Sequence, residues 1–320
     1  MNKLKKKQDR VSRRRFVTLG LLGTGGLWTA WTDLCAARVL PRLFAETRRP
    51  VARPKFCPAP DRWDDNALTA TWLGHSTVLL NFYGITILTD PVLFRRVGAD
   101  LRIGTVGPKR LIDPPLTVWQ LPPIDLVLLS HAHMDHLDVP TLRGLPASTQ
   151  VVTARATGDI LRRTRLRKVT ELGWGEKKTL HVENGRVQIS AFEVKHWGAR
   201  WRRDTYRGYN GYVLNHAGKK IIFGGDTAMS DTFRPLHSQG PFEMAIMPIG
   251  AYQPWECSHC TPEQSLRMAD QAGAQYFLPI HHRTFCLGQE GQVEPMERLE
   301  AAVEKGRLAL RDVGETFRCS

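Results

Sequence analysis

Short apolar runs separated by turn residues recur between residues 68 and 280, and this pattern is typical of β-strands. Tyr83-Gly84 is a turn between two such runs, and Asn184-Gly185 is a strong two-residue hairpin signal. The pattern thus indicates two strand-rich halves. The predicted strands are 68–72, 77–82, 85–88 and 124–130 in the first half, and 187–194, 209–214, 221–224, 244–247 and 276–280 in the second.

Helices are expected after strands in both halves. Val139-Pro140-Thr141 begins a short helix, and residues 156–163, 262–271 and 295–302 form the others. A sheet or a helix must bury its apolar face against another element. The sequence therefore predicts an α/β protein in which two sheets pack face to face with helices outside.

Composition and charge are those of a globular protein with a basic tail. The 320 residues include 9 Trp and 12 Phe, which argues against disorder. The net charge is +14, but residues 1–60 hold 14 Lys/Arg and only 3 Asp/Glu, so most of this charge lies in the tail. The folded domain is then close to neutral, and no nucleic-acid partner is expected.

The tail has the form of an export signal. Lys3 to Arg10 is basic, Ser12-Arg13-Arg14-Arg15-Phe16-Val17 resembles the twin-arginine (Tat) motif, and a Gly-rich, weakly apolar stretch runs to about Trp31. We therefore expect residues 1–37 to be a Tat-type signal peptide, with a retained N-terminal anchor as the alternative. Residues 38–62 are a Pro- and Arg-rich connector. This interpretation predicts the Tat machinery as a partner and a periplasmic or exported protein, membrane-associated if the anchor is retained.

Six cysteines are too few for a disulfide scaffold in a chain of this size. Cys257-Ser258-His259-Cys260 resembles a redox or zinc element, but no second pair completes a four-ligand structural site. Small buried or loop cysteines are the alternative.

Four metal-type ligands lie within six positions in His131-Ala132-His133-Met134-Asp135-His136, directly after the apolar run 124–130. Imidazoles with a carboxylate suit a divalent metal such as zinc. His131 and His133, two positions apart in extended chain, project to the same side and can share one ion. Asp135 and His136 follow the bend and point elsewhere, which favours a second ion. The alternative is a polar loop with chance histidines.

Three more candidate ligands follow predicted strands, namely His196, Asp226 and His281. Each alone could be a hydrogen-bonded turn residue. Four strand ends in one chain, all with metal-compatible side chains, favour a metal site.

The order His131-x-His133-x-Asp135-His136, His196, Asp226, His281 resembles the metallo-β-lactamase superfamily. Over roughly residues 65–300, further blocks resemble the N-acylphosphatidylethanolamine-hydrolysing phospholipase D family. They are Trp72-Leu73-Gly74-His75-Ser76-Thr77, Thr89-Asp90-Pro91, Gly107-Pro108-Lys109-Arg110, Leu121-Pro122-Pro123-Ile124-Asp125, Lys195-His196-Trp197, Gly225-Asp226-Thr227 and Pro248-Ile249-Gly250-Ala251-Tyr252.

The resemblance implies a metallo-β-lactamase fold over residues 63–320, an αββα sandwich of two mixed sheets flanked by helices. It implies two zinc ions per chain. His131, His133 and His196 would hold one ion, Asp135, His136 and His281 the other, and Asp226 would bridge both and orient a hydroxide held between them. Asp135 and Asp226 are thereby expected to act in catalysis as well as in metal binding.

Other residues near these ligands have two interpretations each. His259 is assigned a catalytic contact with phosphate, against a place in the N-terminal capping region of the helix that Pro262 opens. Asp90 and Asp138 are candidate acceptors for imidazole N–H groups. His75 lies near the site in the family, but its role could be packing, and His282 is interpreted as structural.

Aromatic and basic residues flank the ligand loops. Trp197, Trp201 and Trp255 could line an acyl channel or meet a lipid interface, against ordinary core packing. Four basic residues could attract phosphate or anionic headgroups, against a solvated loop. They are Lys195, Arg200, Arg202 and Arg203.

The resemblance implies a zinc phosphodiesterase of phospholipase D type that acts on N-acylphosphatidylethanolamine-like lipids, with a phospholipid or other phosphodiester as substrate and a membrane surface as a further partner. The alternatives are a lactonase or other small-molecule hydrolase on the same two-metal site, or a non-catalytic membrane-associated binding protein. The intact ligand set argues against the last.

Overall fold

The computed structural model describes residues 48–101 and 103–319. The chain divides into two units, Met1–Arg49 and Pro50–Ser320, and the fold below is that of the second unit. The predicted signal or anchor (1–37) lies outside the described residues. Among the described residues, none of the helices combines the length and the apolar character that crossing a membrane requires.

The first sheet of the described unit has seven strands in the order β15-β1-β2-β3-β6-β7-β8. Neighbours from β15 to β3 are antiparallel, and those from β3 to β8 are parallel. The strands are β1 (Leu68–Gly74), β2 (Thr77–Phe82), β3 (Ile85–Thr89), β6 (Leu126–Leu129), β7 (Gln150–Ala154), β8 (Lys168–Leu172) and β15 (Thr316–Cys319). A separate small hairpin joins β4 (Ala99–Asp100) to β5 (Thr105–Val106).

The second sheet has six strands in the order β14-β13-β12-β11-β10-β9 among the described residues. It is antiparallel from β9 to β12 and parallel from β12 to β14. The strands are β9 (Lys177–Val182), β10 (Gly185–Phe192), β11 (Gly211–His216), β12 (Lys219–Phe223), β13 (Phe242–Pro248) and β14 (Ala274–Ile280).

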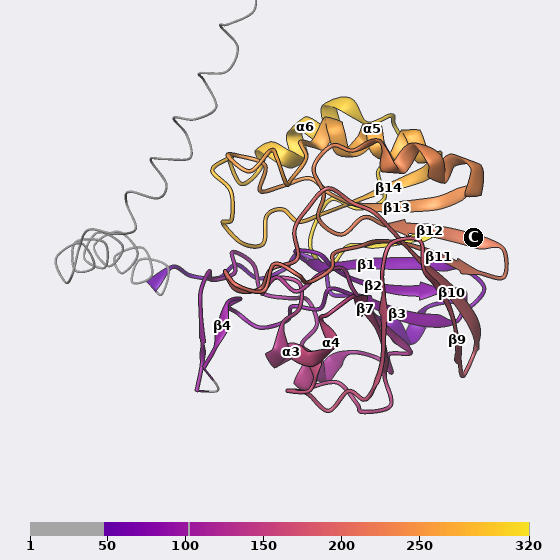
Figure 1. The fold of residues 1–320 in the computed structure, drawn as a ribbon. Coiled ribbons are helices and arrows are strands. Elements are labelled where there is room, and N and C mark those ends of the chain that lie inside the picture. The colour runs from indigo at the N-terminus through magenta and orange to yellow at the C-terminus, as the bar shows by residue number, and fades with distance from the viewer. Residues whose placement is uncertain (1–47, 102, 320) are drawn as a thin grey trace, which may run out of the picture. The chain divides into compact units, whose positions relative to one another are not determined.

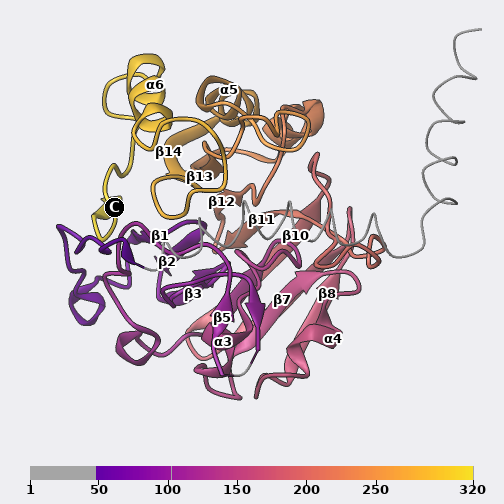
Figure 2. The same ribbon diagram turned by 90° about the vertical axis from the view of Figure 1, so that its left-hand side faces the viewer.

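Helices cover the outer faces of the two sheets, with α5 and α6 on one side and α3 and α4 on the other (Figures 1 and 2). The α-helices are α3 (Val139–Arg143), α4 (Gly158–Leu161), α5 (Pro262–Ala272) and α6 (Glu294–Ala302). Three 3-10 helices are η1 (Pro60–Arg62), η2 (Val118–Gln120) and η3 (Asp231–Gln239). The predicted αββα sandwich of two mixed sheets is confirmed.

Strand β6 illustrates how the layers pack. Leu126 and Leu128 belong to the apolar cluster between the two sheets, whereas Val127 and Leu129 pack into the outer cluster that includes residues of α3 and α4. All four are fully buried, and each contributes about 1.5–3 kcal/mol. Burial on both faces explains why this strand is a continuous apolar run in the sequence.

A side-chain hydrogen bond and a left-handed glycine fix the two ends of helix α5. The Thr261 side chain accepts a hydrogen bond from Gln264 N–H, Pro262 occupies the first turn, and Gly273 closes the helix in a left-handed conformation. Met268 and Ala269 lie on its buried face, in the outer cluster that also contains residues of β13.

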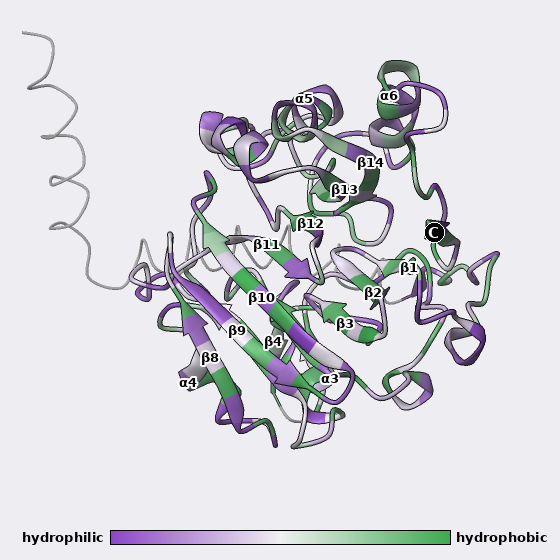
Figure 3. Cartoon of the chain, turned by 90° about the vertical axis from the view of Figure 1, so that its right-hand side faces the viewer, coloured by the Kyte–Doolittle hydropathy of each residue, from purple (hydrophilic) through white to green (hydrophobic). Residues whose placement is uncertain are grey.

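The predicted strands and helices are all present, with ends shifted by a few residues. Strands β4, β5, β7, β8, β9 and β15 were not predicted. Strands β8 and β9 lie at sheet edges and carry exposed polar side chains, visible as alternating hydrophilic and hydrophobic bands in Figure 3, so they lack a continuous apolar run. The predicted Asn184-Gly185 turn is displaced by one residue, because Gly185 already pairs with Val182 at the start of β10.

Candidate metal centre

The candidate ligands occupy loops that leave four strands. His131, His133, Asp135 and His136 follow β6, and His196 follows β10. Asp226 follows β12 and His281 follows β14. The carboxyl ends of neighbouring parallel strands meet at one edge of a sheet, where ligand sites form in α/β proteins.

Gly225 lets two of these loops approach closely. Its φ is +58°, and a Cβ atom there would lie 2.7 Å from the Cβ atom of Ser130, the residue before His131. Asp226 is thereby held beside the histidine loop, although the two loops come from different sheets.

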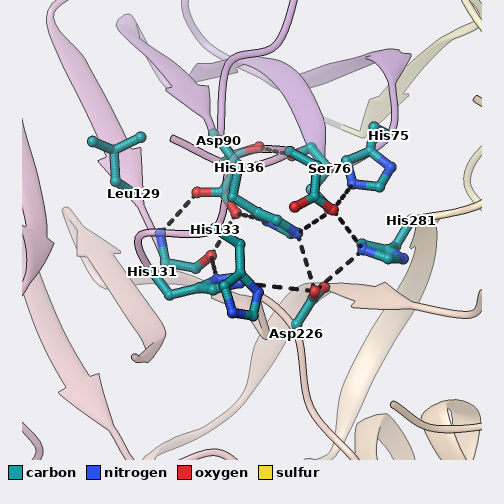
Figure 4. A network of polar contacts seen from close by, with 12 residues as sticks. His75, Ser76, Asp90, Leu129, His131, His133, His136, Asp226 and His281 are labelled. Atoms are coloured by element: carbon teal, nitrogen blue, oxygen red, sulfur yellow. Dashed lines mark hydrogen bonds and ion pairs between the residues drawn. The ribbon is translucent and has the colours of Figure 1, made fainter. Parts of the chain in front are cut away.

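The structure brings all seven predicted metal ligands together around Asp226. Figure 4 shows His131, His133, His136 and His281 beside it. Asp226 Oδ2 lies 3.0 Å from His136 Nε2, 3.2 Å from His281 Nε2, 3.7 Å from His196 Nε2 and 3.9 Å from His131 Nε2. We call His131, His133, His196 and Asp226 the first ligand group, whose ligand atoms lie within 4.8 Å of one another. We call Asp135, His136, His281 and Asp226 the second ligand group.

These residues fit a pair of divalent cations. His131 Nε2, His136 Nε2, His281 Nε2 and Asp226 Oδ1 are buried and have no hydrogen-bond partner. An unsatisfied buried polar group costs about 1–3 kcal/mol, so several that converge on one point are the mark of a cation-binding site. Imidazole nitrogens and carboxylate oxygens are the ligands of zinc-type ions. Two groups that share Asp226 are arranged for two ions.

Burial and neighbouring charges shift the pKa values of the histidine ligands in opposite directions. Burial lowers the pKa of His131 well below its usual value and that of His133 to about 4, so both imidazoles are neutral and offer lone pairs. Burial also opposes protonation of His136, but Asp226 and Asp135 prevail and raise its pKa. Burial also opposes ionisation of Asp226, but His136 and His281 outweigh burial and keep the pKa of Asp226 well below its usual range.

Hydrogen bonds around the ligands fix their orientation. Asp90 accepts from Ser130 N–H (2.7 Å) and from Ser130 Oγ–H (2.6 Å), and its Oδ2 lies 2.6 Å from His136 Nδ1. His136 Nε2 is thereby turned toward Asp226. His196 Nδ1 is 2.9 Å from the carbonyl oxygen of Ser258, which orients its Nε2 in the same way.

Of the two predicted imidazole acceptors, Asp90 is confirmed and Asp138 is wrong. Asp138 caps α3 and accepts hydrogen bonds from Thr141 N–H (3.0 Å) and Oγ–H (2.6 Å). The sequence contained this signal, because an Asp directly before a helix that has Pro in its first turn is typical of an N-cap.

His75 does more than pack. It is buried in the turn between β1 and β2, and its Nε2 lies 2.9 Å from Asp135 Oδ2. The predicted structural role of His282 fits its buried ring, which stacks on Trp72 with centroids 4.4 Å apart.

A cavity of about 210 Å³ opens onto the ligands. Trp197, Trp255 and Leu287 form much of its apolar wall, and His259 lines it beside Asp226 and His281. His259 Nδ1 is 4.0 Å from Asp226 Oδ2 and has no hydrogen-bond partner, and burial lowers the pKa of His259 to about 4. Thr261, not His259, caps α5, so the capping alternative for His259 is wrong.

The other flanking residues lie elsewhere. Arg200 donates from Nη1 to the carbonyl oxygens of Ala132 (3.0 Å) and Leu137 (2.8 Å), so it braces the histidine loop and is not free to meet phosphate. The side chains of Lys195, Trp201, Arg202 and Arg203 are exposed and do not line the cavity.

Among the described residues, neither Cys257 nor Cys260 forms a disulfide or belongs to a candidate metal group. Cys257 is an exposed thiol, and Cys260 is buried with its Sγ 3.5 Å from the carbonyl oxygen of Pro248. The alternative of small buried or loop cysteines is confirmed.

Known proteins resemble this chain in sequence and fold. Residues 86–282 match the family described as "Beta-lactamase superfamily domain". The N-acyl-phosphatidylethanolamine-hydrolyzing phospholipase D 1 of Caenorhabditis elegans is 31% identical over 277 residues, which are 79% of this chain and 74% of the worm protein. An uncharacterized protein of Mycobacterium tuberculosis is 31% identical over 252 residues, 76% of this chain. The chain covers 66% of that mycobacterial relative, just under two thirds of its length.

Among solved structures, the isothiocyanate hydrolase from Delia radicum gut bacteria has the same fold, with a TM-score of 0.61 and 20% identity over 78% of this chain and 98% of that one. The resemblance drawn from the histidine motif is therefore confirmed. The chain belongs to the metallo-β-lactamase superfamily, a family of metal-dependent hydrolases.

Proposed function

We propose that this protein is a zinc-dependent phosphodiesterase of phospholipase D type that hydrolyses N-acylphosphatidylethanolamine-like lipids. The observation that carries the proposal is Asp226, whose Oδ2 lies close to imidazoles of both ligand groups at the floor of an apolar-walled cavity. The worm relative, whose printed name is that of such a phospholipase D, supports the substrate class.

The two ligand groups suit phosphodiester hydrolysis. When bound, a pair of zinc-type ions would activate water near neutral pH and stabilise the charge that develops on the phosphoryl oxygens. The protein holds the ligands for that task in fixed orientations, because Asp90 and the Ser258 carbonyl fix the rings of His136 and His196. Asp226, whose pKa is low, stays a carboxylate and can accept a hydrogen bond from a group in the cavity.

His259 can contact the substrate phosphate. Its ring nitrogen is unpaired at the cavity wall, and the neutral imidazole offers one N–H donor to a phosphoryl oxygen. His259 belongs to the loop before α5, separate from the loops that carry the seven candidate ligands. Its removal should therefore leave metal binding intact.

The wall of the cavity favours a lipid over a sugar phosphate. Trp197 and Trp255 keep 41% and 50% of their surface exposed, next to Leu287. Exposed aromatic surface beside a catalytic centre can be covered by the acyl or glycerol part of a lipid.

We also propose that residues 1–37 are a Tat-type signal, which would bring a folded, metal-loaded enzyme to the periplasm and attach it to the membrane if the segment is retained as an anchor. Replacement of Arg13 and Arg14 by Lys should retain the protein in the cytoplasm on cell fractionation. Undiminished export of that variant would contradict the proposal.

The substrate assignment is tested with the full chain loaded with zinc and offered N-acylphosphatidylethanolamine, phosphatidylcholine, a lactone and bis(p-nitrophenyl) phosphate. We expect N-acylethanolamine and phosphatidic acid as products, and no turnover after chelation. Hydrolysis of the lactone without cleavage of either phosphodiester class would replace the proposal with a lactonase.

A further inference from the structure

We propose that His75 is a positioning residue that builds the second ligand group by holding Asp135 with its side chain and His281 with its main chain. This inference rests on the proposed two-ion function. It assigns a role to a residue outside the seven candidate ligands.

The two ligands come from different halves of the fold. Asp135 follows β6 in the first sheet, and His281 follows β14 in the second. Their side chains approach each other, with His281 Nε2 3.6 Å from Asp135 Oδ2. An ion can bind both ligands only if the two loops are held at the right separation.

His75 contacts both loops. The bond from its Nε2 to Asp135 Oδ2 is 2.9 Å, and because a carboxylate only accepts, that nitrogen carries the hydrogen. Its carbonyl oxygen accepts the main-chain N–H of His281 at 2.9 Å. The two rings also pack, with centroids 4.1 Å apart.

Asp135 is the ligand that most needs such a contact. Its side chain is 19% exposed, whereas that of Asp226 is 1% exposed. A partly exposed carboxylate can rotate into water. The hydrogen bond from His75 opposes that rotation and keeps Oδ2 on the metal side.

His75 is itself held rigidly. Its N–H donates to Thr284 Oγ1 at 2.6 Å, and its carbonyl oxygen accepts Trp72 Nε1–H at 2.7 Å. Its φ of +54° is unusual for a residue other than glycine, and such a conformation persists where surrounding contacts determine it. The β1–β2 ladder shifts register just before it, between Trp72 and Gly74, and such irregularities re-aim side chains at functional sites.

Arg110 also fixes the turn between β1 and β2. Arg110 is buried and donates to the carbonyl oxygens of Leu73 (2.8 Å) and Val92 (2.6 Å). Its Nη2 fills the place that a Cβ atom on Gly74 would take, 2.3 Å away. The chain on both sides of His75 is therefore tied to the body of the first sheet, and His75 carries that rigidity to the two ligands.

The test compares His75→Phe with His75→Gln in the full chain. Phe keeps the ring volume and the main-chain contacts but has no N–H, whereas Gln restores a donor. Zinc binding is titrated against a chelating competitor, and cobalt-substituted spectra report the coordination of each ion. Melting of the chelated proteins shows whether the fold is unchanged. His216→Phe, the same substitution at the end of β11, is the matched control.

We expect wild-type affinity for one ion in His75→Phe and a loss of about 10- to 100-fold for the other, as for other residues that orient metal ligands. His75→Gln should recover part of that affinity, and His216→Phe should match the wild type. Two ions bound with wild-type affinity by His75→Phe, or an equal loss of both, would overturn the proposal.

If His75→Phe does not fold, Thr284→Val provides the second variant, since it removes the acceptor of the His75 N–H and leaves every ligand in place. The second ion should again be the one that weakens. A wild-type protein that binds only one ion would instead contradict the two-ion function, and this result is distinct from the failure of His75 alone.

Discussion

The two ligand groups are built in different ways. The ligands specific to the first group are three imidazoles, and the contacts behind His131 and His196 are neutral, namely the hydroxyl of Ser130 and the carbonyl of Ser258. The second group depends on charged and buried partners, Asp90 behind His136 and His75 beside Asp135. Apart from Asp226, both groups combine two ligands from the loop after β6 with one from a later loop, so the difference lies in the contacts that brace them.

This difference has a consequence for metal binding. A group whose imidazole ligands are braced by a neighbouring hydroxyl and a main-chain carbonyl is ready for an ion as soon as the loops fold. A group whose ligands rely on distant residues loses affinity when any of those residues changes. We therefore expect substitutions outside the ligand set to affect the second ion much more than the first.

The largest effect should follow Asp226→Asn, which touches both groups. The amide removes the charge shared by His136 and His281 and keeps the volume of the side chain. We expect phosphodiester turnover to fall by roughly 10²–10³-fold or more, as when preorganised charge is removed from an active site. Steady-state rates and metal content per chain measure this. Normal turnover with two bound ions would contradict the bridging role.

A smaller and more selective effect should follow Asp90→Asn. The amide cannot accept simultaneously from Ser130 and His136 as the carboxylate does, so His136 loses its fixed orientation. The second ion should weaken about 10- to 100-fold, and the first ion less, because Asp90 reaches His131 through the hydroxyl of Ser130.

Asp138→Asn is the matched control for Asp90→Asn. Asp138 lies two residues from His136 but caps α3. We expect a loss of at most about 1 kcal/mol in the free energy of unfolding and two ions bound normally. Equal metal loss in both variants would remove the distinction between the two carboxylates.

These two carboxylates also mark what the sequence could predict. The seven candidate ligands were identified because each follows an apolar strand, and strand ends meet at one edge of a sandwich. Asp90 follows a strand as well, and β3 is the parallel neighbour of β6, so its place beside His136 follows from topology. Asp138 required the capping pattern to be weighed against the proximity of the ligands.

The contact between His75 and Asp135 could not be predicted, because the residues are 60 positions apart and the contact depends on how the β1–β2 turn meets the loop after β6. Strands β8 and β9 were missed for a different reason. They are edge strands whose exposed side chains are polar, so their pairing depends on a neighbour and not on their own apolar pattern.

His259→Ala should separate substrate contact from metal binding. The side chain lies 4.0 Å from Asp226, but all seven candidate ligands remain in the variant, so both ions should bind with normal affinity. Turnover of phosphodiesters should fall about 10- to 100-fold, the value of a hydrogen bond to a charged group. A variant that loses metal instead would make His259 part of the ligand shell.

The smallest effect should follow Trp255→Ala. Trp197 packs on His133, with ring centroids 4.6 Å apart, so its removal would disturb the first ligand group, whereas Trp255 only forms cavity wall. Truncation of a half-exposed indole removes about 1 kcal/mol of apolar contact, and KM for a lipid substrate should rise about 5-fold. KM for bis(p-nitrophenyl) phosphate should change less, since that substrate has no acyl chain to cover the wall. Trp119→Ala, at an exposed tryptophan outside the cavity, is the control, and an equal rise in KM for both substrates would indicate that the wall does not bind lipid.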